Sequence, residues 1–372
     1  MASTTWNGSA STDWATGANW STGSVPTTGA HVVIPDTSSI NNCVLDQTRT
    51  IGSLTVQANG TLVGGGFTLN ITGEGDASGG TEGYAAEIDG HISGELNLIS
   101  TKDGTTYLDL NCQSGNIHDL TINSSGGDYK ILVGNTTLTG TLWIKDGNLK
   151  MNGDSDTLDV TEGIKLGNGS DAGFFGHNDH DGAITTGYLQ LGTSSSTFIS
   201  TEGTLTLTQD STDALIYETI SGSTFTNNDG TVLITGDGRV KARAGTGNFH
   251  NVTLNASGNT IEQSAVDVTI EGNLTITAGE WHTGTAGLGY SNLTVTGLTE
   301  IGPASGGADQ ATLNCHSGTI SLGSGLTSSH ALIVNQGGTF TGGSGNHTIG
   351  SIDVKNNSNA KCTLTSGNTT VD

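Results

Sequence analysis

A long internal repeat limits the folds that this chain of 372 residues can adopt. Residues 115–123 (GNIHDLTIN) match residues 247–255 (GNFHNVTLN) at an offset of 132, and the match continues without a gap as far as Gly147 and Gly279. Self-similarity of this kind is typical of stacked structural units, in which every unit repeats the same turn chemistry. A β-sandwich has turns at similar spacing but no reason to repeat its sequence in this way.

Each repeated unit consists of short strands separated by turns. Runs such as residues 138–144 (LTGTLWI) alternate apolar and polar side chains, which is the period of a β-strand. The 59 glycines and the many Thr, Ser and Asn residues exclude a helical protein, while 32% hydrophobic residues exclude a flexible linker. We therefore predict an all-β chain folded as a right-handed parallel β-solenoid over residues 36–372, with rungs of roughly 22 residues and about 15 rungs.

The first 35 residues differ from the rest because they hold three of the five tryptophans, Trp6, Trp14 and Trp20. Large aromatic side chains bury much area, and the open end of a solenoid exposes strand edges that would pair with other chains. We predict that residues 1–35 form an N-terminal cap or attachment segment. The alternative is an exposed tryptophan platform that binds sugar, so the three residues are also candidate assembly or ligand contacts.

The charge of the chain excludes two classes of partner. A formal net charge of -24 repels phosphate backbones and anionic lipid, so we expect neither nucleic acid nor a membrane surface as partner. No stretch reaches the length of an apolar membrane helix. The first residues (MASTTW) lack the basic region and apolar core of a Sec signal peptide, so we expect no export by that route.

The four cysteines, Cys43, Cys112, Cys315 and Cys362, do not form C-x-x-C pairs, which argues against a zinc site. Each lies two residues from a leucine in a strand-like run, and this spacing places both side chains on one face. We predict four buried thiols that fill the core, with disulfides or ligand-binding thiols as the minority alternative.

The opening pattern W-N-G…W…N-W-S-x-G-x-V-P, followed by a strand and by F/H-N-V-T-L rungs, resembles the β-solenoid regions of bacterial surface proteins. It is also similar to β-helical structural proteins of tailed bacteriophages. The resemblance implies a rigid part of a virion: a fibre, a spike or a capsid decoration. It further implies other virion proteins and host surface glycan as partners, and a homotrimer by analogy with phage fibres. It carries no catalytic motif across.

Three basic residues alternate along one predicted strand. Arg239, Lys241 and Arg243 point the same way from the strand and are three of only 11 basic residues in the chain. We interpret them as candidate contacts with an acidic neighbour in an assembly, with a solvated surface or a lyase-type base cluster as alternatives.

Two acidic or histidine-containing stretches are candidate sites of another kind. Residues 177–181 (HNDHD) could bind a divalent metal, although a solvated turn fits better because no standard ligand spacing is present. The region from Glu74 through Glu87, Asp89 and Glu95 is the densest in carboxylates, and it also contains Tyr84. A glycosidase needs a pair of carboxylates, but the sequence does not select one, so we interpret the region as a solvated lateral loop.

The sequence contains no Walker loop, Rossmann glycine pattern, zincin helix or G-x-S-x-G turn. We therefore expect no catalytic residue, no cofactor and no metal. The predicted function is that of a non-enzymatic structural virion protein. The alternatives are a polysaccharide-degrading tailspike and a secreted β-helical adhesin or surface-layer protein, located outside the cell or at its surface.

Overall fold

The computed structural model describes residues 3–73, 83–176, 179–241, 248–264, 266–285, 289–303, 310–323, 331–355 and 359–371. The chain is nearly all β, and its parallel strands stack as a β-solenoid of about 13 turns, which confirms the predicted fold class. The expectation of about 15 rungs is too high because some turns carry long loops. Leu54, for example, pairs with Ala86, and Thr299 pairs with Leu332.

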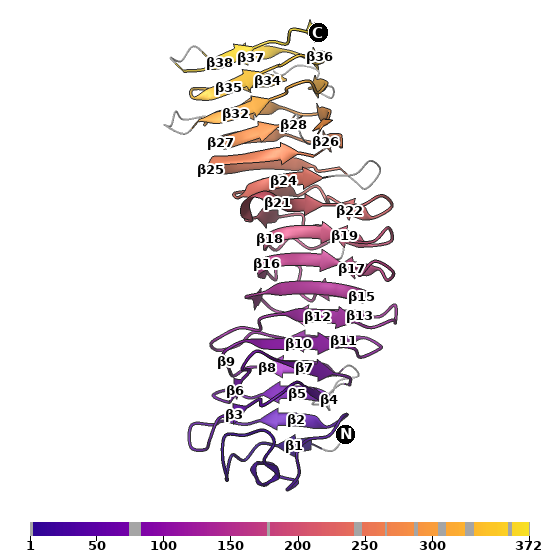
Figure 1. Ribbon diagram of the computed structural model, residues 1–372, viewed down its shortest axis with the longest axis vertical. Helices are drawn as coiled ribbons and strands as arrows, with labels where there is room; N and C mark the ends of the chain where they lie inside the picture. The colour runs from indigo at the N-terminus through magenta and orange to yellow at the C-terminus, as the bar shows by residue number, and fades with distance from the viewer. Residues whose placement is uncertain are drawn as a thin grey trace. The chain divides into compact units, whose positions relative to one another are not determined.

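The chain divides into two compact units, residues 1–182 and 183–372, each with strands at three positions in the turn. In unit 1 the first face consists of β1 (Ser3–Thr5), β2 (His31–Ile34), β5 (Ser53–Val56), β8 (Tyr84–Ile88), β11 (Thr106–Asp109), β13 (Tyr129–Val133), the end of β15 (Thr141–Met151) and β17 (Gly173–Phe175). The second face consists of β4 (Arg49–Ile51), β7 (Phe67–Ile71), β10 (Leu96–Ser100), β12 (Leu120–Asn123), the start of β15 and the end of β16 (Leu158–Leu166). A third set consists of β3 (Cys43–Val44), β6 (Thr61–Val63) and β9 (His91–Ser93), and β14 (Thr136–Leu138) pairs with the start of β16. Figure 1 draws these strands as arrows in successive layers.

Unit 2 repeats this arrangement. One face consists of the start of β18 (Ile184–Leu191), β20 (Thr204–Leu207), β23 (Thr231–Ile234), the starts of β25 (Asn251–Gln263) and β27 (Leu274–His282), β31 (Thr299–Ile301), β34 (Leu332–Val334) and β37 (Ile352–Val354). The next consists of the end of β18, β21 (Asp210–Glu218), β24 (Asp237–Lys241), the ends of β25 and β27, β32 (Ala311–Asn314), β35 (Gly338–Thr341) and β38 (Lys361–Thr363). The third consists of β26 (Val268–Ile270), β30 (Leu293–Val295), β33 (Ile320–Leu322), β36 (His347–Ile349) and β39 (Thr369–Val371). Beside these faces, β19 (Thr197–Ile199) pairs with β22 (Thr224–Thr226), and β28 (Gly284–Thr285) forms an antiparallel hairpin with β29 (Gly289–Tyr290).

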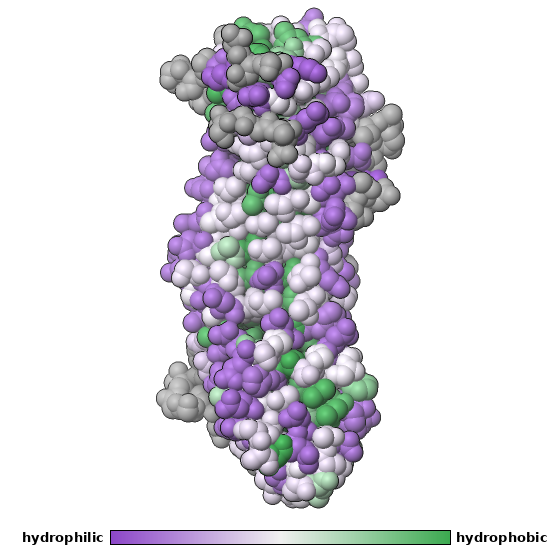
Figure 2. Space-filling view, turned by 90° about the vertical axis from the view of Figure 1, so that its left-hand side faces the viewer, coloured by the Kyte–Doolittle hydropathy of each residue, from purple (hydrophilic) through white to green (hydrophobic). Residues whose placement is uncertain are grey.

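The core consists of columns of apolar side chains, one from each rung. Leu98, Leu120, Leu142 and Ile164 follow one another in register at intervals of 22 residues, and all four are buried. Because the strands are parallel and in register, similar side chains stack on one another and every strand inside a face has its backbone hydrogen bonds on both sides. On the face shown in Figure 2 the described residues are mainly hydrophilic or intermediate, with small hydrophobic patches.

The internal repeat corresponds to a repeated corner. The Asp119 carboxylate accepts the backbone N–H of Thr141 at 2.7 Å, and at the matching place the Asn251 amide oxygen accepts the N–H of Asn273 at 3.0 Å. A glycine precedes each of the two donors, and there is no room for a side chain at this position. A Cβ added at Gly272 would lie 2.5 Å from the Asn251 side-chain oxygen. The sequence repeat therefore preserves a hydrogen-bonded turn between rungs.

The three tryptophans of the N-terminal segment are buried and pack together. Trp6, Trp14 and Trp20 are each at most 1% exposed, and the ring of Trp20 packs edge-on against the other two at 4.9 and 4.7 Å. Trp20 Nε1 donates to the carbonyl of Trp14 at 2.8 Å, and Trp6 Nε1 donates to the carbonyl of Asn41 at 2.7 Å. The short 3-10 helix η1 (Gly17–Asn19) leads into Trp20. The rings are covered by their own chain, so they present no exposed platform to a sugar.

The four cysteines are free thiols. Cys43 and Cys315 are buried, as predicted, whereas Cys112 and Cys362 are only half-buried. Cys362 lies on the last described turn, where Leu364 is also 46% exposed. Burial raises the pKa of Cys112 to about 11, so this thiol stays protonated at neutral pH.

Candidate functional site

The basic stripe of unit 2 is largely neutralised within the chain. Arg239 and Lys241 lie on β24 and each faces an acid of a neighbouring rung. Arg239 Nε lies 3.7 Å from the Glu262 carboxylate, and Lys241 Nζ lies 2.7 Å from that of Glu218. Arg243 lies outside the described residues. An acidic partner would therefore have to displace two intrachain ion pairs to contact this strand.

The histidine-rich loop is described only in part, because residues 177 and 178 lie outside the described residues. His180 is buried and its Nε2 lies 2.8 Å from the carbonyl oxygen of Asp156. The Asp156 carboxylate accepts the backbone N–H groups of Gly153 and Gly134 at 2.8 and 3.1 Å. These groups hold a turn, and within the described ranges no three His, Cys, Asp or Glu side chains form a metal-binding group.

The most distinctive surface of unit 1 is a strip of aromatic side chains on its first face. Half of the aromatic residues that are not buried lie there. We call this surface the aromatic face and define it by Tyr84 on β8, Tyr107 on β11, Tyr129 on β13 and Phe174 on β17. The rings of Tyr84 and Tyr107 lie 5.5 Å apart, and those of Tyr129 and Phe174 lie 5.8 Å apart.

The strand register makes the aromatic face continuous. Tyr107 pairs with Tyr84 on one side and with Ile131 on the other, and Ile131 is only 6% exposed. Tyr129 precedes Ile131 by two residues, so both project from the same side of β13. The ammonium of Lys150 lies 5.1 Å from the centre of the Tyr129 ring, a cation–π contact at the edge of the strip.

A pair of carboxylates borders the aromatic face. Glu87 pairs in register with Asp109, so these two side chains project from adjacent strands, whose backbones are about 5 Å apart. Asp89 follows directly at the end of β8. Burial raises the pKa of Glu87, and the negative charges of Asp89 and Asp109 raise it further. Burial also raises the pKa of Asp109, although the hydrogen bond that its carboxylate accepts from the Asn111 N–H acts in the opposite direction.

The same negative charges act on the adjoining phenol. Burial raises the pKa of Tyr84, and Asp109, Glu87 and Asp89 raise it further. The phenol therefore stays neutral at physiological pH and can donate or accept a hydrogen bond. Aromatic side chains and carboxylates thus lie together on one face of unit 1.

A β-bulge brings these groups together. The interpretation of this region as a solvated lateral loop is wrong for Tyr84–Ile88, because these residues form the strand β8. The register between β8 and β11 shifts after Tyr84, so Ala85 is an extra residue in the ladder and both Ala85 and Ala86 are buried. With strict alternation Tyr84 and Glu87 would point to opposite faces. The bulge places them on the same one. Glu95, from the same acidic region, precedes β10 on another face, and residues 74–82 lie outside the described residues.

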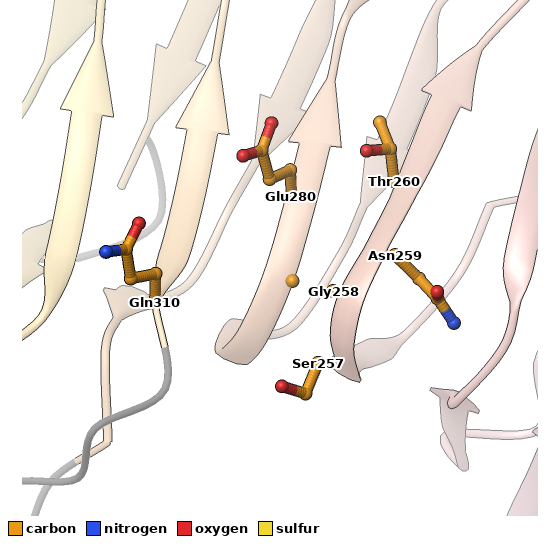
Figure 3. A pocket seen from close by; sticks show the side chains of 7 residues that line it. Ser257, Gly258, Asn259, Thr260, Glu280 and Gln310 are labelled. Atoms are coloured by element: carbon orange, nitrogen blue, oxygen red, sulfur yellow. The ribbon is translucent and has the colours of Figure 1, made fainter.

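Unit 2 contains a polar pocket of about 310 Å³. It is lined by Ser257, Gly258, Asn259, Thr260, Gly279, Glu280 and Gln310. Figure 3 shows Glu280 between Thr260 and Gln310, each from a different strand or strand end. The Glu280 carboxylate lies 2.8 Å from His282 Nε2. The lining has no aromatic side chain, so the pocket lacks the apolar surface that most small-molecule sites provide.

Comparison with known protein families gives a match over the N-terminal part of the chain. A family described as "Domain of unknown function (DUF8693)" matches residues 5–80, about a fifth of the chain, which takes in the tryptophan cap and the first rungs. No curated protein and no solved structure matches the chain. In the described part of the chain, no helix combines the length and the hydropathy that a bilayer span requires.

Proposed function

We propose that this chain is a non-enzymatic structural protein of a bacteriophage virion, a fibre, a spike or a capsid decoration, that supplies a rigid element for assembly or adhesion. The observation that carries the proposal is the in-register stacking of parallel strands through each unit, together with the buried cap. A solenoid of this kind is stiff because every turn is tied to its neighbours by backbone hydrogen bonds and by stacked side chains.

The surface chemistry agrees with a structural role. The basic side chains of β24 are paired within the chain, and the described loop around His180 is held by backbone hydrogen bonds. A net charge of -24 keeps such a protein soluble before assembly. A secreted adhesin or surface-layer protein would use the same architecture and is the alternative setting.

The test is to find the protein in its particle. Density-purified particles from the source culture should contain peptides of this chain at a fixed number of copies per particle, and labelled antibodies should mark one site on the particle. Presence in the cell envelope fraction and absence from the particles would overturn the proposal. A native mass near three times 37.6 kDa would assign a fibre or spike, and a monomer would assign a decoration.

A polysaccharide-degrading tailspike is a second candidate, favoured by the paired carboxylates Glu87 and Asp109. Retaining glycosidases place two carboxyl groups about 5 Å apart, and the general acid needs a raised pKa. Purified protein incubated with polysaccharide from the host should then release reducing ends, and Glu87→Gln and Asp109→Asn should each abolish the release. No release by the unaltered protein would reject the enzyme and leave the structural proposal standing.

A further inference from the structure

The aromatic face of unit 1 has the composition of a binding surface. Its four rings lie half-buried, so each keeps part of its area in contact with solvent. The Phe rings inside unit 2 behave differently: Phe198 and Phe225 stack in parallel at 6.0 Å and are at most 2% exposed. Aromatic side chains serve the core in one case and remain on the outer surface in the other.

We propose that the aromatic face binds an extended, neutral polysaccharide that runs across the strands from β8 towards β17. The apolar faces of pyranose rings stack on flat aromatic side chains, and hydroxyl groups around the ring need nearby acceptors. Tyr84 and Tyr107 supply the stacking surface, and the carboxylates of Glu87 and Asp109 supply the acceptors beside it. This inference rests on the adhesive role in the proposed function and names the class of ligand for that role.

The spacing of the rungs fits such a ligand. Successive strands of the face are about 4.8 Å apart, which is close to the length of one pyranose unit in an extended chain. One sugar ring can therefore lie over each rung, with the phenols of Tyr84 and Tyr107 under consecutive rings. On the next rung Ile131 lies in register between Tyr107 and Lys150 and is only 6% exposed, so Tyr129 on the same strand is the ring available to the ligand there.

The charge of the face selects a neutral polymer. Glu87, Asp89 and Asp109 lie together at one edge, on a protein of net charge -24. An acidic polysaccharide would be repelled by these carboxylates and by the net charge of the protein, whereas Lys150 contacts the other end of the strip, at Tyr129. A neutral chain meets no such repulsion and can donate its hydroxyl hydrogens to the carboxylates.

Affinity electrophoresis in native gels tests the proposal. Gels contain mixed-linkage β-glucan, xylan or galactomannan as neutral probes, and alginate as the acidic one. We expect at least one neutral polymer to slow the full chain and alginate to leave it unaffected. The double variant Tyr84→Ser/Tyr107→Ser should weaken binding by about ten-fold or more, the scale of losing one or two contact residues of an interface. Tyr107→Phe should keep it, because the stacking ring remains.

Tyr290→Ser is the matched control, since Tyr290 is 47% exposed and lies in unit 2. It should bind like the unaltered chain. Retardation by none of the neutral polymers, retardation by alginate, or equal binding by the double variant would each overturn the proposal. A dimer that the double variant converts to monomer, without polysaccharide binding, would show that the face contacts a second copy instead. None of these results bears on whether the chain is present in particles, so the two proposals fail separately.

Discussion

Replacing Trp20 by alanine should open the cap and leave the later rungs intact. The ring is 1% exposed, touches both neighbouring indoles and donates a hydrogen bond of 2.8 Å to the Trp14 carbonyl. Removing a buried tryptophan costs about 3–5 kcal/mol, because the lost apolar contacts leave a cavity. Each turn of a solenoid touches only its neighbours, so this loss should stay in the cap and the first rungs.

Hydrogen exchange followed by mass spectrometry measures this directly. Amides of β1 and β2 should exchange more than about 100-fold faster in Trp20→Ala, the factor that a loss of 3 kcal/mol gives. Amides of β12 and β15 should exchange at the same rate as before. The exposed edge of the first rung should also make the variant prone to association, seen as increased light scattering.

Trp143→Ala is the matched control. Its indole also donates a hydrogen bond to a carbonyl, that of Gly167 at 2.9 Å, but the ring is half-buried beneath Lys145 on the outer surface. It should cost about 1–2 kcal/mol and leave the cap unchanged. Unchanged exchange of β1 and β2 in Trp20→Ala would refute the cap as a packed element. Equal acceleration throughout the chain would refute the local response.

Three further substitutions have defined expectations. Lys130 is buried, donates a hydrogen bond to the Gly104 carbonyl, and has a pKa lowered by burial. Lys130→Met should therefore raise the free energy of unfolding in urea by about 1 kcal/mol at pH 7. The gain should be smaller above about pH 11, where the unaltered lysine is largely neutral in both the folded and the unfolded state. The pKa of Glu87 is raised, so the folded state binds this proton more readily than the unfolded state and loses stability as the pH rises. Glu87→Gln should therefore stabilise the chain at pH 7 but not at pH 4. Thermal unfolding at both pH values measures this difference. Asn273→Ala removes the acceptor of the Leu298 N–H, and should cost about 1 kcal/mol in urea unfolding.

The repeat and the alternation of side chains were sufficient to predict the architecture. The match between residues 115–123 and 247–255 reflects a turn that recurs because Asp119 and Asn251 hold the next rung in the same way. The clustering of three large rings near the N-terminus favoured burial over an exposed platform, and all three rings are buried. The lengths of the loops were not predictable, so the predicted number of rungs, about 15, exceeded the observed number of about 13 turns.

The candidate site could not be predicted because it depends on an exception to the alternation. Tyr84 and Glu87 share a face only because the ladder contains one extra residue between them. Tyr107 and Asp109 come from another rung, and the sequence does not state which rungs lie next to each other when loops vary. The ion pairs of β24 were unpredictable for the same reason, because Glu218 and Glu262 come from neighbouring rungs and are distant in sequence from Lys241 and Arg239.

The two copies of the corner, 132 residues apart, hold the next rung through the same hydrogen bond and so occupy equivalent positions in the turn. Recombination between the two gene segments would therefore remove or add a block without turning inward side chains outward. Leu120 would be succeeded by the sequence that now follows Val252, and the partner column would still receive an aliphatic side chain, Leu274 in place of Leu142. A gene of this kind can change the length of its product in whole turns, a route to new sizes that does not require a new fold.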